Sequence, residues 1–343
     1  MNLSLLSEEL VEYCFENVSN SCVKVNRSLA LKIVMYFLLV FTVVLTVFGN
    51  LFVMILISHF KQLHSPNNVL VLSLANADFL VGLLVLPFCI IRSVETCWYW
   101  GSFLCRLHTC MDLLLCTVSI YHLCFIAIDR YYAICKPLHY TRKINYEVIS
   151  LFIFLAWMIP GVCSFGIIYS KSNEQGLEDV LAILTCEGGC LLLYNKLCAL
   201  LGLLIFIAPC VVMIGIYTKI FCVAKRQAKI ANNRERKILS DEDNKKRVTQ
   251  KREQKAAKTL GIIMGIFLLC WLPFFIDIAI DVYVDFSTPM AISEALTWLG
   301  YVNSAFNPLI YALFYPWFRK ALKMIVTGRI FSSGSSDIQL YTQ

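Results

Sequence analysis

Apolar residues are concentrated in seven long stretches of this chain, and short polar segments separate one stretch from the next. A helix needs about 20 predominantly apolar residues to cross a bilayer, and each stretch is long enough. The pattern therefore predicts an all-α membrane protein built as a bundle of seven transmembrane helices. The stretches cover residues 31–58, 67–91, 103–128, 147–168, 192–222, 258–284 and 291–314.

The remaining segments divide the chain into four parts. Residues 1–30 form an N-terminal tail, residues 31–314 the transmembrane bundle, and residues 328–343 a flexible tail. Between bundle and tail, residues 315–327 mix basic and apolar side chains, which predicts an amphipathic helix lying against membrane lipid. No cleavable signal peptide is expected, because residues 1–28 hold four Glu and lack an adequate apolar core.

Composition and charge set the orientation. The chain is 59% hydrophobic with a mean hydropathy of +0.69, which excludes an ordinary soluble domain. Residues 225–258 hold 13 Lys or Arg against five Asp or Glu, so the positive-inside rule makes this loop cytoplasmic and the N-terminus extracellular. The net charge of +7 comes mostly from this loop, which favours lipid or protein partners over nucleic acid. Asn-x-Ser glycosylation sequons on the extracellular side begin at Asn2, Asn17 and Asn26.

A single carboxylate, Asp112, interrupts the otherwise uncharged stretch from Leu107 to Ile128. An acid at membrane depth is costly unless it is paired or faces a water-filled cavity. Lys and Arg are few in the outer halves of the spans, with Arg92 as the candidate near the second, so an internal partner is scarce. The cluster Asp129-Arg130-Tyr131 follows about 27 Å further along a helix, close to the opposite membrane face. We therefore expect a protein that binds a cation on the extracellular side and transmits a signal to the cytoplasmic side.

Each span also carries a polar or proline-containing motif that a simple lipid anchor does not need. In their order and spacing these motifs resemble those of the rhodopsin-like G-protein-coupled receptors, over about residues 50–318. The resemblance implies an extracellular ligand site and a heterotrimeric G protein as cytoplasmic partner. The motifs include Gly49-Asn50, Leu74-Ala75-Asn76-Ala77-Asp78, Trp157 with Pro160, Pro209 with Tyr217, Cys270-Trp271-Leu272-Pro273, and Asn303 to Tyr311.

A closer resemblance is to the trace amine-associated receptors. It rests on Cys186-Glu187-Gly188-Gly189-Cys190, on Cys22, and on the run from Tyr311 to Lys320. It implies an amine receptor, olfactory in most members, that raises cAMP through a stimulatory G protein at the plasma membrane. It also implies the disulfides Cys105–Cys190 and Cys22–Cys186, with Cys14 and Cys97 as alternatives for the second bridge. Metal binding by Cys186 and Cys190 is a weak alternative, because no His accompanies them.

The resemblance also assigns the ligand site. Asp112 stands where aminergic receptors hold the ammonium, and Tyr301 where a hydroxyl steadies that acid. Leu201, Gly202 and Ile205 stand where catecholamine receptors carry serines, so we expect an apolar amine rather than a catecholamine. The further residues expected around the ligand are the aromatic Trp271, Phe274, Phe275 and Trp298, together with Leu113, Cys116 and Ile278.

Glu294 offers a candidate second cation site. It lies seven residues before Tyr301, on the same helical face and nearer the outside, so a diamine could bridge it to Asp112. The alternative is a solvated rim charge that steers cations inward.

The cytoplasmic end is expected to act as the switch. Arg130 can pair with Asp129 and with Glu253, and Tyr217 and Tyr311 are placed to stabilise the open form. No cofactor is expected, apart from a structural sodium ion that the resemblance places at Asp78, Ser119, Asn303 and Asn307.

Other functions agree less well with the sequence. A conventional serotonin-like or histamine-like receptor is disfavoured by the missing donors in the fifth span and by the Cys22 and Cys186 pair. An organic-cation transporter should show internal repeats with broken helices, and none is apparent. An enzyme is not expected, because the aqueous segments contain no nucleophile–base constellation.

Overall fold

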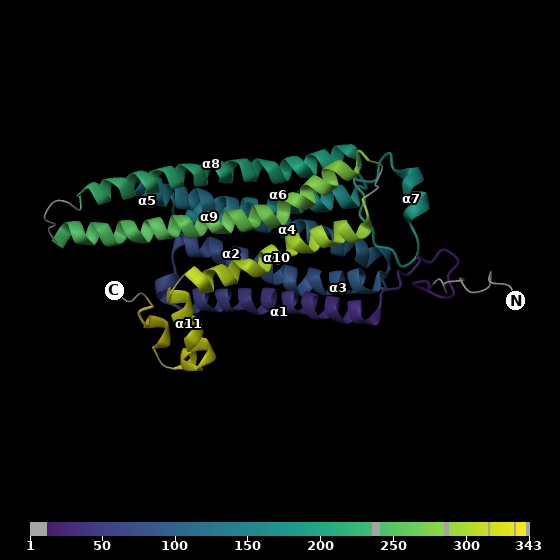
Figure 1. Cartoon of the computed structure of the whole chain (residues 1–343), viewed down its shortest axis with the longest axis horizontal. Coiled ribbons are helices and arrows are strands. Elements are labelled where there is room, and N and C mark those ends of the chain that lie inside the picture. The colour runs from purple at the N-terminus through teal and green to yellow at the C-terminus, as the bar shows by residue number, and fades with distance from the viewer. Residues whose placement is uncertain (1–11, 235–240, 285–287, 315, 333, 341–343) are drawn as a thin grey trace.

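The computed structural model describes residues 12–234, 241–284, 288–314, 316–332 and 334–340, without the side chains of residues 141, 227–234, 241–260, 314, 316 and 317. In this part of the chain, seven long helical segments lie side by side along the longest axis (Figure 1). The predicted all-α bundle of seven helices is confirmed. The segments are α1 (Leu29–His59), α2 (Pro66–Leu80) continued by η3 (Val81–Val85) and α3 (Leu86–Glu95), α4 (Gly101–Cys135), α6 (Tyr146–Tyr169), α8 (Lys196–Arg234), α9 (Asp241–Asp281) and α10 (Met290–Phe314).

Short elements complete the chain. Only isolated β-bridges occur among the described residues, at Tyr13–Val23 and Ser21–Glu187. The helices α8 and α9 extend together past the other helices at the cytoplasmic end (Figure 1). The short elements are η2 (Lys61–Leu63), α5 (Pro137–Lys143), α7 (Glu178–Leu184), α11 (Pro316–Val326), η4 (Arg329–Phe331) and η5 (Ser335–Asp337).

The last long helix, α10, differs from the others in composition. Six of the described helical segments are long and apolar enough to cross a membrane by themselves, and α10 is not among them. Its polar residues Asn303, Ser304 and Asn307 are all buried, so they face the interior of the bundle rather than lipid. Packing against the other helices thus compensates for the lower hydropathy of this span.

The second span contains a π-helical turn that the sequence analysis did not foresee. It covers Val81–Val85 and ends two residues before Pro87, whose ring nitrogen has no hydrogen to donate. Beyond the turn, α3 buries Cys89 and Val94 in one cluster with Tyr301 of α10. The irregular turn therefore sets the face that the outer half of this span presents to the ligand region.

The described part of the C-terminal tail, which is expected to be flexible, makes contacts with the segment around the end of α1. Lys61 pairs with Asp337 at 3.0 Å, and the Ser335 hydroxyl lies 2.9 Å from the Nε2 atom of His59. Leu340 is only 2% exposed and packs in the cluster of Phe60. Its apolar and charged contacts hold the described tail against the segment that follows α1.

Candidate ligand cavity and cytoplasmic switch

A cavity of about 130 Å³ lies among α4, α6, α8, α9 and α10, in the half of the bundle nearer the N-terminal tail. Its wall combines one carboxylate with mostly apolar and aromatic side chains, which is the usual character of a small-molecule site. Eight residues that the sequence analysis placed at the ligand line it, namely Asp112, Leu113, Cys116, Trp271, Phe274, Phe275, Ile278 and Tyr301.

Asp112 is the only charged residue on the described wall of this cavity. Its carboxylate accepts a hydrogen bond from the Tyr301 hydroxyl at 2.7 Å and one from the Cys116 thiol at 3.3 Å. None of the ion pairs formed by the described residues includes Asp112. Both hydrogen-bond partners are neutral, and Arg92 interacts with the carboxylate electrostatically without an ion pair, so Asp112 remains available to attract a cation in this apolar setting.

Aromatic rings form the wall on the side of α8 and α9. Phe206 stacks on Phe275 with ring centroids 4.0 Å apart, and Phe274 meets Phe275 edge to face at 5.4 Å. Trp271 and Phe274 also pack edge to face, with ring centroids 5.9 Å apart. The faces of such rings attract an ammonium group and its apolar substituents, so the cage suits a cation held by Asp112.

The position of Trp271 depends on a glycine in α10. A Cβ atom on Gly300 would lie 2.8 Å from the Cζ3 atom of Trp271, which leaves no space for a methyl group. We expect Gly300→Ala to displace the rigid indole and to cost about 1–3 kcal/mol of stability. Thermal unfolding of the purified variant in detergent measures this cost.

The matched control is Gly265→Ala in α9, where an added Cβ meets no atom within 4 Å. An unchanged melting temperature in Gly300→Ala, or an equal loss in both variants, would contradict the close packing of Gly300 on Trp271.

Three residues that the sequence analysis expected at the ligand do not line the described cavity. Trp298 instead donates its indole N–H to Ser93 at 3.0 Å and packs edge to face on Tyr301. It therefore packs against that tyrosine instead of lining the cavity. Leu201 is 42% exposed on the outer surface of α8, and Gly202 takes its place on the wall. Glu294 forms an ion pair with Arg27 at 3.2 Å.

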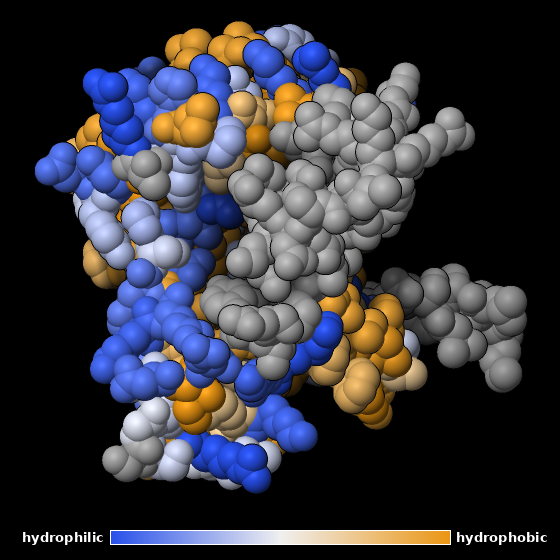
Figure 2. All heavy atoms as spheres, turned by 90° about the vertical axis from the view of Figure 1, so that its left-hand side faces the viewer, coloured by the Kyte–Doolittle hydropathy of each residue, from blue (hydrophilic) through white to orange (hydrophobic). Residues whose placement is uncertain are grey.

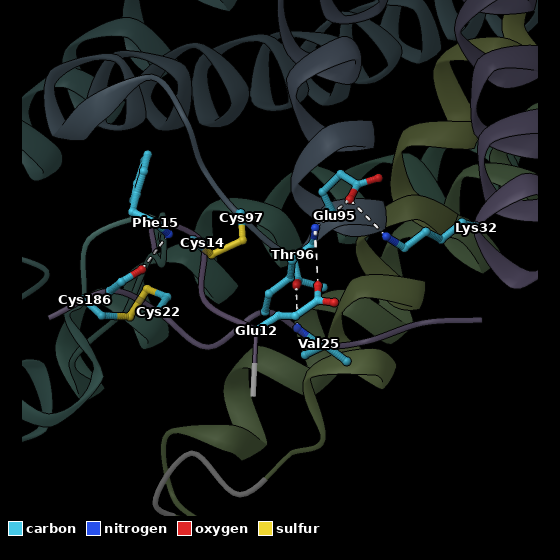
Figure 3. The surroundings of a disulfide bond; sticks show 12 residues. Glu12, Cys14, Phe15, Cys22, Val25, Lys32, Glu95, Thr96, Cys97 and Cys186 are labelled. Carbon is cyan, nitrogen blue, oxygen red and sulfur yellow. Dashed lines mark hydrogen bonds and ion pairs between the residues drawn. A yellow bond between two sulfur atoms is a disulfide. The ribbon is translucent and has the colours of Figure 1, made fainter. Parts of the chain in front are cut away.

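Three disulfides fasten the N-terminal tail and the loops over the extracellular end. They are Cys105–Cys190, Cys22–Cys186 and Cys14–Cys97. The first two pairs are those that the family resemblance implied, and Cys14 and Cys97 join each other instead of replacing a member of the second. Figure 3 shows two of these bonds beside the ion pair of Lys32 with Glu95, which measures 3.1 Å. The sequons at Asn17 and Asn26 lie exposed on this tail, and Asn2 falls outside the described residues.

Several wall residues were missed by the sequence analysis, among them Thr117, Cys163 and Tyr194. Tyr194 lines the cavity from the loop that precedes α8. It lies four residues after Cys190, and the bond of Cys190 to Cys105 draws this loop toward the outer end of α4. The disulfide was the signal that could have identified it.

At the cytoplasmic end, buried Asp129 accepts hydrogen bonds from two residues. Arg130 donates through Nε at 2.7 Å and also through its terminal nitrogen, and the Tyr140 hydroxyl donates at 2.9 Å. Burial and the Asp129 charge raise the pKa of Tyr140 to about 12, so its hydroxyl keeps its proton at neutral pH. Tyr140 in α5 was not foreseen, and the side chain of Glu253, the other expected partner of Arg130, lies outside the described residues.

A second cavity, of about 260 Å³, opens beside this cluster. Arg130, Tyr217 and Tyr311 line it, so three of the expected switch residues meet at one place. Tyr131 lies nearby, with its ring 5.8 Å from the Lys136 ammonium. Figure 2 shows hydrophilic side chains over much of the described cytoplasmic end and hydrophobic patches on its flanks.

A buried polar cluster lies between the two cavities. Asp78 accepts hydrogen bonds from Ser119 at 3.0 Å, from Ser304 at 2.8 Å and from the Asn307 amide at 2.7 Å. The Nδ2 atom of Asn303 is buried without a partner. Carboxylate and hydroxyl oxygens are suitable ligands for a hard cation, so the residues fit a sodium ion.

Comparison with known proteins places these features in a family. The model of the 7 transmembrane receptor (rhodopsin family) matches residues 49–311. Trace amine-associated receptor 4 of Mus musculus is 47% identical over 96% of both chains. Trace amine-associated receptor 13c of Danio rerio is 48% identical over 100% of both chains. Trace amine-associated receptor 9 of Mus musculus is 50% identical over 98% of this chain and 97% of its own.

Proposed function

This chain belongs to the rhodopsin family of seven-transmembrane receptors and, within it, to the trace amine-associated receptors, and on that basis we propose that it detects extracellular amines through their ammonium group. It is a multi-pass membrane receptor and not an enzyme. The observation that carries the proposal is the Asp112 carboxylate, which meets only neutral donors inside an aromatic cavity. An ammonium ion is the group that best complements such a site.

The proposed ligand has an apolar body. The stretch of α8 on the cavity wall supplies Gly202, Leu203 and Ile205, which have no side-chain donors for ring hydroxyls. Ring hydroxyls placed against this stretch of α8 would lose their hydrogen bonds to water without replacement there, which costs binding free energy.

We also expect monoamines to be preferred over diamines. Arg27 already neutralises Glu294, so a second ammonium group would have to displace an arginine to use that acid. Glu294 therefore serves as an anchor for the N-terminal tail in the ligand-free receptor.

Binding would shift an equilibrium that exists without ligand. An amine drawn to Asp112 presses on the cage of Phe274, Phe275 and Trp271, above the hinge that Pro273 introduces in α9. Outward movement of the cytoplasmic half of α9 would open the cavity beside Arg130 to a heterotrimeric G protein.

Family membership supports the finer parts of the proposal. They are a stimulatory G protein with a rise in cAMP, a place in the plasma membrane, and expression in olfactory sensory neurons. The α11 helix, with Arg319, Lys320 and Lys323 beside buried Phe318 and Met324, would lie against membrane lipid.

The test is a paired panel in cells that express the full chain. Each alkyl or aryl-ethyl amine is matched with the alcohol of the same carbon skeleton, and cAMP and G-protein dissociation are recorded separately. Responses to the amines and not to the alcohols are expected. Equal responses to both, or silence to every amine from receptor detected at the surface, would overturn the proposal, and G-protein dissociation without cAMP would overturn only the stimulatory class.

A further inference from the structure

The C-terminal tail returns to the first cytoplasmic loop. After α11 the chain turns at Gly328 and again at Gly334, and both glycines have a positive φ, of 69° and 78°. Glycine adopts this conformation without strain, so the two turns direct η5 back onto η2. Figure 1 shows the yellow segment after α11 beside the cytoplasmic end of α1. We call residues 335–340 the clasp.

Polar contacts reach the clasp from two sides. In the first cytoplasmic loop, the side-chain oxygen of Gln62 accepts the Leu340 backbone N–H at 3.0 Å. From α11, the Lys320 ammonium donates to the Gln339 carbonyl at 2.8 Å. The ion pair of Lys61 adds an attraction of opposite charges, but its two side chains are more than half exposed, so water screens it. These contacts fix the position of the clasp more than they stabilise it.

Leu340 supplies the apolar part of the contact. It is 2% exposed and belongs to the buried cluster of Phe60, Phe318 and Met324. Ile338, two residues earlier on the clasp, is 37% exposed. Burial of a whole aliphatic side chain is worth more than an exposed ion pair. Leu340 is therefore the residue that decides whether the clasp stays docked.

The same cluster forms part of the wall of the cytoplasmic cavity beside Arg130. Val53, Leu56 and Phe318 belong to the cluster of Leu340 and also line that cavity. The ring centroids of Phe318 and Tyr311 lie 6.3 Å apart, and Tyr311 lines the cavity as well. The docked clasp thus packs behind the wall that contains one of the expected switch residues.

We propose that the clasp is an autoinhibitory contact, which favours the closed cytoplasmic cavity while it is docked and raises ligand-independent signalling when it is released. A G protein enters only after the walls of the cavity separate, and interactions made in the closed form alone shift the equilibrium toward that form. Packing of Leu340 behind Phe318 is such an interaction. The proposal rests on the proposed function, because it needs a G protein to bind this cavity.

Leu340→Asp tests the clasp in the full chain. A carboxylate at this position would be desolvated in an apolar cluster, so the clasp would leave its docked place. Ile338→Asp is the matched control, because it adds the same charge two residues away at a position that is partly exposed to water. Leu340→Ala reduces the apolar contact without burying a charge, and it serves if Leu340→Asp does not reach the surface.

The first measurement is G-protein dissociation without ligand, normalised to the receptor at the cell surface. Leu340→Asp should raise it at least about threefold, and Leu340→Ala about twofold. The half-maximal concentration of an activating amine should fall in the same variants, because a larger fraction of receptor is then competent to bind. Ile338→Asp should follow the wild type in both respects. A clasp with a merely structural role would lower surface expression without raising the signal of each receptor.

The second measurement is amide hydrogen exchange of the peptides that contain Leu340, in purified receptor. The Leu340 N–H is bound to Gln62, so exchange should be slow in the wild type and fast in Leu340→Asp. Fast exchange in the wild type, or basal dissociation in Leu340→Asp equal to that of the wild type or of Ile338→Asp, would overturn the clasp while leaving the amine receptor intact. A receptor from which no amine dissociates a G protein would instead overturn the proposed function and the clasp with it.

Discussion

Asp112→Asn is expected to weaken activation by amines by about 100-fold to 1,000-fold. The asparagine is nearly the same size and can still accept from Tyr301, but it leaves the ligand ammonium buried without a counter-charge. Removal of one partner from a buried charge pair typically costs about 3–5 kcal/mol. The structure offers no replacement, because Asp112 is the only charged residue on the described cavity wall.

The measurement is the half-maximal concentration for a strong amine agonist, with surface receptor quantified in parallel. Tyr301→Phe is the graded control, because it removes the 2.7 Å hydrogen bond and keeps the charge. It should lose only about tenfold, the value of one hydrogen bond to a charged group. An Asp112→Asn receptor with wild-type potency would show that the acid has a structural role and that the ammonium is held elsewhere.

Asp78→Ala is expected to destabilise the folded receptor so strongly that little of it remains, instead of affecting only ligand recognition. The substitution removes the hydrogen-bond acceptor that Ser119, Ser304 and Asn307 share, and all three donors are buried. Each unsatisfied donor costs about 1–3 kcal/mol, and three together approach the whole stability of a typical domain. We expect little receptor at the cell surface and a strongly lowered melting temperature in detergent.

Asp78→Asn separates loss of the acceptor from loss of the charge. Its amide oxygen can still accept from two of the three donors, so it should keep most of the surface expression. If Asp78→Ala proved as stable as the wild type, water or an ion would have to satisfy the three donors, and the cluster would not be a centre of stability.

The sequence by itself determined the architecture and the charged landmarks. Seven apolar stretches must cross the bilayer because their backbone groups can pair only within a helix in hydrocarbon. The basic segment 225–258 predicted the orientation, and the isolation of Asp112 in an apolar stretch pointed to a candidate cation site. These inferences depend on local composition and on the properties of the bilayer, so they needed no knowledge of packing.

The sequence did not show which of two neighbouring positions on an apolar helix faces the cavity. Leu201 and Gly202 differ by one residue, yet only Gly202 lies on the described cavity wall. Because α8 meets lipid on one side and apolar protein on the other, its hydrophobic pattern carries little information about direction. Trp298 was misplaced for the same reason, since one turn of α10 separates the cavity from the packing against α3.

Contacts between distant segments also required the tertiary structure. Arg27 meets Glu294 across 267 residues of sequence, and Cys14 meets Cys97 across 83. The connectivity of several cysteines cannot be deduced from their spacing. The contacts of the C-terminal tail, Lys61 with Asp337 and Leu340 in the cluster of Phe60, likewise join segments far apart in sequence.

The wall of the ligand cavity shows the same division. The sequence contains Cys163 and Ala199 as small residues among many others in apolar helices, and nothing local distinguishes them. Only the packing of α6 and α8 against α4 brings them to the wall of one cavity. A cavity belongs to the gap between several helices, so its shape is fixed by tertiary packing and not by any one segment.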